Sequence, residues 1–206
     1  MDNRANNEFE TCYYDSIKEI LSGVSNSDLL SEEEYFALPT NRHVEFSQGR
    51  LNWPPPVTMT HQSCVAHLCI LLNSFVEGNK LGMVLIGAFP VRLWVGEYRS
   101  PDIIFLLSEH RYRRHEHYWE TPDLVIEIVS ASNRSHDLET KRIEYAQAGI
   151  PEYWIVDPEE RTISVLILHG EKYAVHGMFG EGQTATSVLL PGFEVNVSEV
   201  WAAAEL

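Results

Sequence analysis

Two acidic residues lie where a carboxylate is costly unless it has a partner. Glu127 is in the middle of the run Pro122–Val129, which is apolar on both faces of a strand and therefore predicts a central strand covered on both sides. Asp102 directly precedes a second apolar run, residues 103–107. A buried unpaired carboxylate costs several kcal/mol, so Glu127 is expected to be neutral, paired or bound to a cation. If the two strands are neighbours, both carboxylates can bind one hard cation such as magnesium. The alternative is a structural salt bridge from Glu127 to an arginine across the sheet.

Lys141 is the third residue with a chemical role in this prediction. In a helix predicted over residues 135–148, it shares one face with Leu138, Tyr145 and Ala148, and that face should pack on the sheet. The lysine is therefore expected to lean inward, toward a carboxylate of a neighbouring strand. The alternative is a lysine that extends past the apolar face and places its ammonium group in water.

These three residues belong to a longer pattern. The pattern consists of Ser100-Pro-Asp102, Pro122-Asp-Leu-Val-Ile-Glu-Ile-Val-Ser-Ala-Ser132, Asp137, Lys141, Tyr145 and Gly149-Ile-Pro-Glu-Tyr-Trp-Ile-Val-Asp-Pro158. It resembles the "putative restriction endonuclease" family of the PD-(D/E)-x-K nuclease superfamily, from about Ser31 to near the C-terminus. The resemblance implies an α/β protein of the restriction-endonuclease-like fold, with a mixed central β-sheet flanked by helices.

The resemblance also implies a role for each matching residue. Asp102 resembles the Pro-Asp metal ligand, and Glu127 resembles the second acidic ligand. Glu45, in a hairpin predicted over residues 43–53, resembles an acidic position that precedes a turn glycine. The superfamily lysine, two residues after the second acid, would fall at Val129 in this chain. Lys141 instead matches a lysine on the following helix.

The implied activity is hydrolysis of a phosphodiester, with DNA as the expected substrate and Mg²⁺ or Mn²⁺ as the cofactor. The cation held by Asp102 and Glu127 would lower the pKa of a bound water and neutralise charge on the phosphate. Lys141 would orient that water or stabilise the transition state. Glu45 would assist the metal or accept a proton.

A nuclease-like domain that no longer cuts, and serves as a nucleic-acid-binding or regulatory module, is the second interpretation. The chain has 15 basic and 30 acidic residues, a formal charge of −15, and such a surface repels nucleic acid at long range. This charge and Val129 favour the second interpretation. The combination of Asp102, Glu127 and Lys141 favours the nuclease, because apolar residues would fill buried structural positions at a lower desolvation cost.

One locally basic and aromatic stretch, His110–Trp119, separates the two acidic candidates. Its arginines, Arg111, Arg113 and Arg114, are candidates for contact with a phosphate backbone near the site. The alternative is an exposed segment whose charges are solvated. A zinc site at His61, Cys64, His67 and Cys69 is not expected, because their directions spread around one helix.

The chain of 206 residues is predicted to form one domain, residues 31–206, preceded by a helical arm over residues 1–30 that could support a homodimer. Ser31 and Glu34 fit a capping box at the start of a short helix. The other predicted elements are a helix over 60–77 and strands at 83–95 (broken near Gly87), 102–107, 123–129, 152–157 and 162–168. Three cysteines without a C-x-x-C pair, no signal peptide and no apolar span predict a cytoplasmic protein without a membrane partner.

Overall fold

The computed structural model describes residues 29–38, 44–54, 56–130, 134 and 136–205, so nearly all of the predicted arm lies outside the described residues. The helical elements are α2 (Glu32–Ala37), α3 (Met59–Asn79), the 3-10 helix η1 (Ser108–Arg113), the π-helical turn η3 (His136–Thr140), α4 (Lys141–Gln147) and α5 (Val197–Ala204). The strands are β1 (Glu45–Ser47), β2 (Arg50–Asn52), β3 (Gly82–Ile86), β4 (Val91–Trp94), β5 (Glu97–Arg99), β6 (Ile103–Leu107), β7 (Trp119–Glu120), β8 (Leu124–Ile128), β9 (Glu152–Asp157), β10 (Thr162–His169), β11 (Lys172–Phe179), β12 (Thr184–Thr186) and β13 (Glu194–Asn196).

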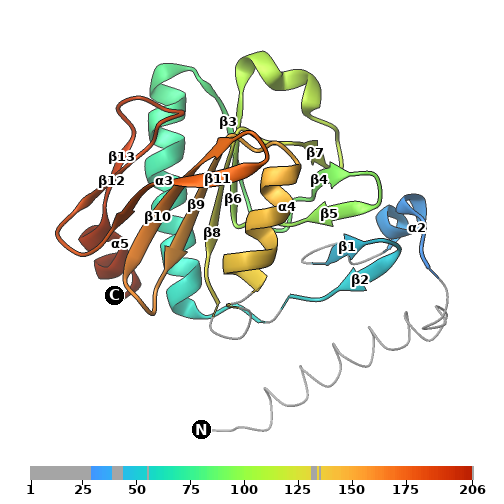
Figure 1. Cartoon of the computed structure of the whole chain (residues 1–206), viewed down its shortest axis with the longest axis horizontal. Coiled ribbons are helices and arrows are strands. Elements are labelled where there is room, and N and C mark those ends of the chain that lie inside the picture. Colours follow the sequence, from blue (N-terminus) through green and yellow to red (C-terminus); the bar gives the residue numbers. More distant parts are fainter. Residues whose placement is uncertain (1–28, 39–43, 55, 131–133, 135, 206) are drawn as a thin grey trace, which may run out of the picture.

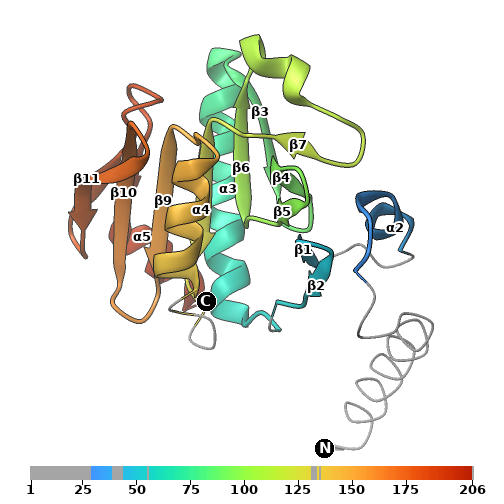
Figure 2. The same ribbon diagram turned by 45° about the vertical axis from the view of Figure 1, so that its right-hand side comes forward.

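A mixed six-stranded sheet forms the centre of the molecule, in the order β11-β10-β9-β8-β6-β3. Strands β8 and β9 are parallel, and the other neighbours are antiparallel. Helices α3 and α5 cover one face of this sheet, and α4 covers the other (Figures 1 and 2). The predicted mixed sheet with helices packed against it is confirmed.

Strand β8 is central, as its sequence predicts, and all five of its residues are buried. Its alternate side chains divide between two hydrophobic cores. Leu124, Ile126 and Ile128 pack with α3 and α5, whereas Val125 and the following Val129 pack with α4. Because successive side chains of a strand point to opposite faces, Glu127 shares the α4 face with the two valines.

A second, smaller sheet in the order β2-β1-β5-β4-β7 was not predicted. The predicted break near Gly87 is confirmed, and the two strands on either side of it belong to different sheets, since β3 pairs with β6 while β4 pairs with β5 and β7. The chain changes direction between them, where Ala88 has a positive φ of 66°. The predicted hairpin around Gln48 and Gly49 is confirmed as β1 and β2 and forms part of this second sheet.

Three helix boundaries can be compared with the sequence. The Ser31–Glu34 capping box is present at α2. Helix α3 ends at Asn79, with Lys80 in the left-handed conformation, two residues beyond the predicted end at Glu77. The helix predicted over 135–148 begins as the π-helical turn η3 and becomes α-helical only at Lys141. Within the described residues, no helix combines the length and apolarity needed to cross a membrane.

Candidate active site

Asp102 and Glu127 lie next to each other on neighbouring strands. Strands β6 and β8 are antiparallel with Ile103 opposite Ile126, and continuing that register by one residue places Asp102 opposite Glu127. Residues opposite each other in an antiparallel pair project from the same face. Asp102 Oδ2 accepts a hydrogen bond of 2.7 Å from the backbone N–H of Ile128, the residue after Glu127, which ties its carboxylate to strand β8. The prediction that the strands carrying the two carboxylates are neighbours is confirmed.

Lys141 reaches Glu127 from the facing helix. Its Nζ lies 2.9 Å from Glu127 Oε2, and both residues are buried, with relative exposures of 7% and 3%. The inward orientation predicted for Lys141 is therefore confirmed, and the solvent-exposed alternative is wrong. Within the part of the chain that the structure describes, Glu127 forms its ion pair with this lysine on α4.

Tyr145 also contacts Glu127. Its hydroxyl donates a hydrogen bond of 2.5 Å to Glu127 Oε1. Burial raises the pKa of Tyr145 well above its ordinary value, and the charge of Glu127 raises it further. The side chain therefore remains a neutral phenol that donates to the carboxylate. Lys141 and Tyr145 are four residues apart, so one face of α4 presents both of them to Glu127.

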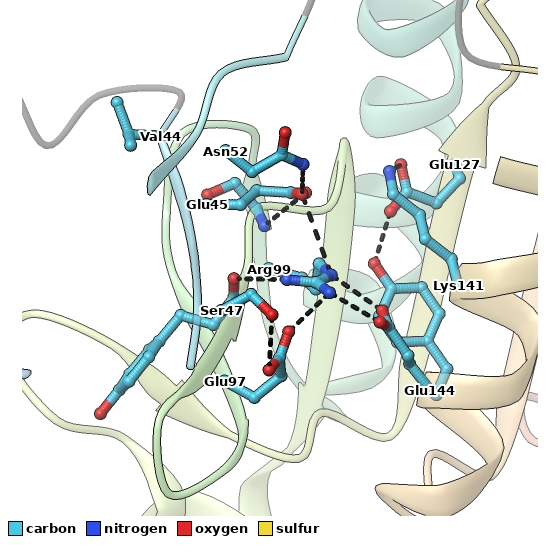
Figure 3. Close-up of polar contacts among 12 residues, drawn as sticks. Val44, Glu45, Ser47, Asn52, Glu97, Arg99, Glu127, Lys141 and Glu144 are labelled. Atoms are coloured by element: carbon cyan, nitrogen blue, oxygen red, sulfur yellow. Dashed lines mark hydrogen bonds and ion pairs between the residues drawn. The ribbon is translucent and has the colours of Figure 1, made fainter. Parts of the chain in front are cut away.

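Glu45 lies at the edge of the same site and is held by three contacts. Its carboxylate accepts from Asn52 Nδ2 at 3.2 Å and from the backbone N–H of Ser100 at 3.5 Å. The third contact is an ion pair of 3.8 Å with Arg99 Nε. Glu45 also contributes to the raised pKa of Tyr145, so its charge acts on the residues around Glu127. Figure 3 shows Glu45 and Glu127 on either side of Arg99.

Arg99 is the buried centre of this network and was missed by the sequence analysis. It donates two hydrogen bonds to Glu144, from Nε at 2.8 Å and from Nη2 at 2.6 Å, and its Nη2 also lies 2.6 Å from Glu97 Oε1. Burial alone would lower the pKa of Arg99, but the hydrogen bonds to Glu144 and the charges of Glu45 and Glu97 raise it overall. The only sequence signal for Arg99 is that it precedes Asp102 by three residues.

His61 is a second contact that the sequence did not predict. It lies in the first turn of α3, and its Nε2 is 3.2 Å from Asp102 Oδ2. The side chain is buried, and it reaches the carboxylate from the end of the helix that covers the opposite face of the sheet. His61 and the backbone N–H of Ile128 thus hold the same oxygen of Asp102.

The site carries an excess of negative charge. Its five carboxylates face two permanent cations, Arg99 and Lys141, which leaves a formal charge of −3 with His61 neutral; the carboxylates are those of Asp102, Glu127, Glu45, Glu97 and Glu144. Among the described residues, no group of three or more His, Cys, Asp or Glu is placed to hold a metal ion. Magnesium is commonly bound through one or two carboxylates and several waters, so Asp102 and Glu127, on neighbouring strands, have the ligand chemistry that this ion prefers.

The basic segment lies at the other end of strand β6. Asp102 precedes this strand, whereas η1, with Arg111 and Arg113, follows it (Figure 1). Arg113 donates to the carbonyl of Thr121 at 3.0 Å, and Arg114 donates to the carbonyl of Leu106 at 3.3 Å. The sequence predicted that these arginines lie near the acidic site. That prediction is wrong, because a strand of five residues spans roughly 17 Å and separates them from Asp102. Their contact with a phosphate elsewhere on the surface stays a prediction.

The fold and the site define a protein of the restriction-endonuclease-like class. Residues 32–198 match the Uma2 family, described as "putative restriction endonuclease". The chain belongs to this family, which is part of the PD-(D/E)-x-K superfamily.

Among solved structures, the chain is similar to a protein of Anabaena variabilis described as a "putative nuclease belonging to DUF820". The TM-score is 0.69 with 16% sequence identity, over 85% of this chain and 99% of that one. At this identity the likeness shows the fold alone, and it confirms the predicted fold class. A search among curated proteins finds no match.

Proposed function

We propose that this protein is a magnesium-dependent nuclease that hydrolyses phosphodiester bonds, with DNA as its substrate. The observation that carries the proposal is the buried contact of Lys141 with Glu127, directly beside Asp102. Membership of a family of "putative restriction endonucleases" supports the same class of activity. A purely structural role would not require these charges, because apolar side chains of similar volume fill such positions at a lower desolvation cost.

Each residue of the site has a task in this proposal. Asp102 and Glu127 would hold Mg²⁺, which when bound supplies a water of lowered pKa and neutralises charge on the phosphate. Tyr145 orients the Glu127 carboxylate through its hydrogen bond. The ammonium of Lys141, 2.9 Å from Glu127, would donate to the attacking water or to a phosphate oxygen. Glu45, at the edge of the site, would accept the proton released by the water.

The position of Val129 is compatible with this arrangement. Val129 is buried and packs in the core under α4, so a lysine there would have to displace apolar contacts. The superfamily has its lysine two residues after the second acid. In this chain Lys141 on α4 contacts that acid instead. The same charge therefore reaches the same carboxylate from a different element.

A binding or regulatory module without catalysis is the second candidate. Lys141 already neutralises Glu127 by direct contact, and the net charge of −15 opposes the approach of nucleic acid. In that case the acidic pair would have no detectable affinity for divalent cations. A homodimer, predicted from the N-terminal arm, stays a prediction for either function.

Calorimetric titration of Mn²⁺ tests the proposal without knowledge of the substrate. We expect one site in the wild type that is lost in Asp102→Asn and in Glu127→Gln, with unchanged circular dichroism. Glu159→Gln is the matched control, because it removes one carboxylate that is exposed in the turn after β9. If the folded wild type binds no Mn²⁺ at neutral pH, the metal site is contradicted. The binding or regulatory module without catalysis is then the remaining candidate.

Incubation with labelled oligonucleotides then tests the activity. We expect Mg²⁺-dependent cleavage of DNA by the wild type and by Glu159→Gln, and none by Glu127→Gln. Parallel single-stranded DNA, double-stranded DNA and RNA substrates identify the nucleic acid. If the protein binds metal but cleaves none of these nucleic acids, the proposed nuclease activity is contradicted while the proposed metal site is supported.

A further inference from the structure

Strand β3 forms one edge of the central sheet. Among the described residues it pairs with β6 on one side and with no strand on the other. Its sequence is Gly-Met-Val-Leu-Ile, and the side chains of Met83 and Ile86 are 42% and 54% exposed. Edge strands usually carry charged residues, a proline or a bulge, each of which prevents pairing with another chain. Strand β3 has none of these, so its free edge is a template for a further strand.

The opposite edge of the same sheet, β11, is protected in the usual way. It begins at Lys172, directly after Glu171, and it includes His176. Its ladder with β10 is interrupted by a bulge between Val165 and Leu166. Of the two edges of this sheet, one therefore has features that prevent strand pairing and the other lacks them.

The surface around β3 is nearly free of charged residues. Helix α3, which packs beside β3 (Figure 2), has one Asp, Glu, Lys or Arg among its 21 residues, namely Glu77. Residues 81–91, which include β3, have none, although 22% of the whole chain is charged. The outer face of α3 instead exposes Gln62, Ala66 and Ile70. Charged residues are depleted in the core of protein interfaces, and this surface has that composition.

The ladder with β6 determines which backbone groups of β3 point to the free edge. The N–H of Gly87 donates to the carbonyl of Asp102 at 2.8 Å, in register with the β3–β6 pairs. Residues of an antiparallel strand alternate between bonding to the neighbour and pointing away from it. Counting back from Gly87, the residues whose N–H and C=O groups point away from β6 are Gly82, Val84 and Ile86.

A second copy of the chain is the partner that fits this edge. An antiparallel pair centred on Val84 places Val84 of the two copies opposite each other and Gly82 opposite Ile86. All three outward-pointing residues then have partners, and the interface is two-fold symmetric and closed. Elsewhere the net charge of −15 makes two copies repel each other, so they approach at the lowest electrostatic cost where the surface has almost no charge.

We propose that the protein forms a dimer in which β3 of one copy pairs antiparallel with β3 of the other, with the two α3 helices side by side. The two central sheets then join into one continuous sheet. This interface differs from the N-terminal arm, the dimer contact that the sequence predicts. Because the two-fold axis is perpendicular to the joined sheet, both α4 faces, and with them both Glu127 side chains, lie on the same side.

The dimer does not depend on the proposed function. For the proposed nuclease, however, it has a consequence. Strand β3 adjoins the acidic site through the hydrogen bond from Gly87 to Asp102, and the dimer presents both sites to one nucleic acid.

Analytical ultracentrifugation of the full chain tests the interface. We expect a dimer in the wild type and a dissociation constant raised at least about tenfold in Ile86→Lys, because a charge at an edge opposes strand pairing. Val175→Lys is the matched control and should associate like the wild type, since Val175 is 55% exposed on the other edge strand, β11. Ile86→Pro removes an N–H that points away from β6, so it should also weaken the dimer while retaining the β3–β6 ladder.

Hydrogen exchange of single amides, followed by nuclear magnetic resonance, provides a second measurement. In the wild-type dimer the amides of Val84 and Ile86 are bonded across the interface, so they should exchange as slowly as that of Leu85, which is bonded to β6. In Ile86→Lys the amide of Val84 should exchange faster, whereas that of Leu85 stays protected. The wild-type measurement keeps the inference testable if neither Ile86 variant folds.

Three outcomes would overturn the inference. The first is a wild type that is monomeric at every concentration measured. The second is slow exchange of the Val84 amide in such a monomer, which would assign the free edge of β3 to another segment of the same chain. The third is a dimer that a folded Ile86→Lys and a folded Ile86→Pro leave unchanged, which would place the interface elsewhere, for example at the N-terminal arm.

Discussion

At the scale of single residues, the Lys141–Glu127 pair determines how the site tolerates substitution. Lys141→Met leaves the buried carboxylate without its counter-charge, and breaking such a pair costs about 3–5 kcal/mol of the free energy of unfolding. Urea denaturation at neutral pH measures this loss. Adding Glu127→Gln to Lys141→Met should recover a large part of it, because the unpaired charge is then removed.

Lys172→Met is the control for the lysine, because Lys172 is exposed on β11 and should change the stability by less than about 0.5 kcal/mol. A similarly small effect of Lys141→Met would mean that the charge of Glu127 is compensated without the lysine.

The second residue-scale prediction concerns Tyr145 and alkaline pH. Its pKa is raised in the folded protein by burial and then by the charges of Glu127, Tyr153 and Glu45, so the neutral phenol stabilises the fold. This contribution is fully present below the unfolded pKa of about 10 and is lost as the pH rises beyond it. Tyr145→Phe should therefore reduce the stability at neutral pH by about 1.5–3 kcal/mol, the value of a hydrogen bond to a charged group.

Above pH 10 the difference between wild type and Tyr145→Phe should shrink, because only the wild type has this phenol to ionise. Urea denaturation at several pH values measures it. Tyr35, Tyr98 and Tyr173, whose pKa values are also raised by burial, are unchanged in both proteins. Tyr112→Phe, at an exposed position, is the matched control. A constant difference across pH would contradict the assigned ionisation.

At the scale of elements, strand β9 anchors the segment before β13 through one buried carboxylate. Glu152 accepts hydrogen bonds from Trp154 Nε1, Ser187 Oγ and the backbone N–H groups of Val188 and Leu189, at 2.6–2.9 Å. Glu152→Ala leaves these donors without their acceptor, so we expect a loss of roughly 3 kcal/mol or more. Hydrogen exchange at Val188 and Leu189 should accelerate more than at β8.

The Mn²⁺ affinity of Glu152→Ala provides the internal control. Glu152 pairs with Leu124 in the β8–β9 ladder, three residues before the level of Glu127, so the metal site should be unaffected. A loss of Mn²⁺ binding in the folded variant would show that the two ends of β9 are coupled.

At the scale of the whole molecule, the net charge of −15 limits how the protein engages nucleic acid. A protein that makes 6–10 phosphate contacts loses about 10³–10⁵ in affinity between 50 and 200 mM salt. Here we expect a loss below about tenfold at constant Mg²⁺, because the described site contributes few cations. Fluorescence anisotropy with catalytically impaired Glu127→Gln measures it. A steep salt dependence whose slope decreases by about one unit in Arg111→Ser would instead assign part of the binding to the basic segment.

Local patterns in the sequence determined much of the site. Continuous apolar residues predicted the central strand around Glu127, since only a strand covered on both faces has that pattern. The helical spacing of Lys141 and Tyr145 predicted a common inward face, because residues four apart lie on one side of a helix. The family pattern added Glu45, which the structure brings to the same region as Asp102 through the neighbouring Ser100.

Contacts between distant segments were decided only by the tertiary structure. The second sheet depends on the pairing of β1 with β5, some fifty residues apart, and no local periodicity encodes which strands pair. Arg99 and His61 acquire their partners through that long-range arrangement, so their roles were invisible in the sequence. The position of Arg111 relative to Asp102 has the same cause. A strand carries the chain away from the site, and sequence separation alone does not show at which end of the sheet a residue lies.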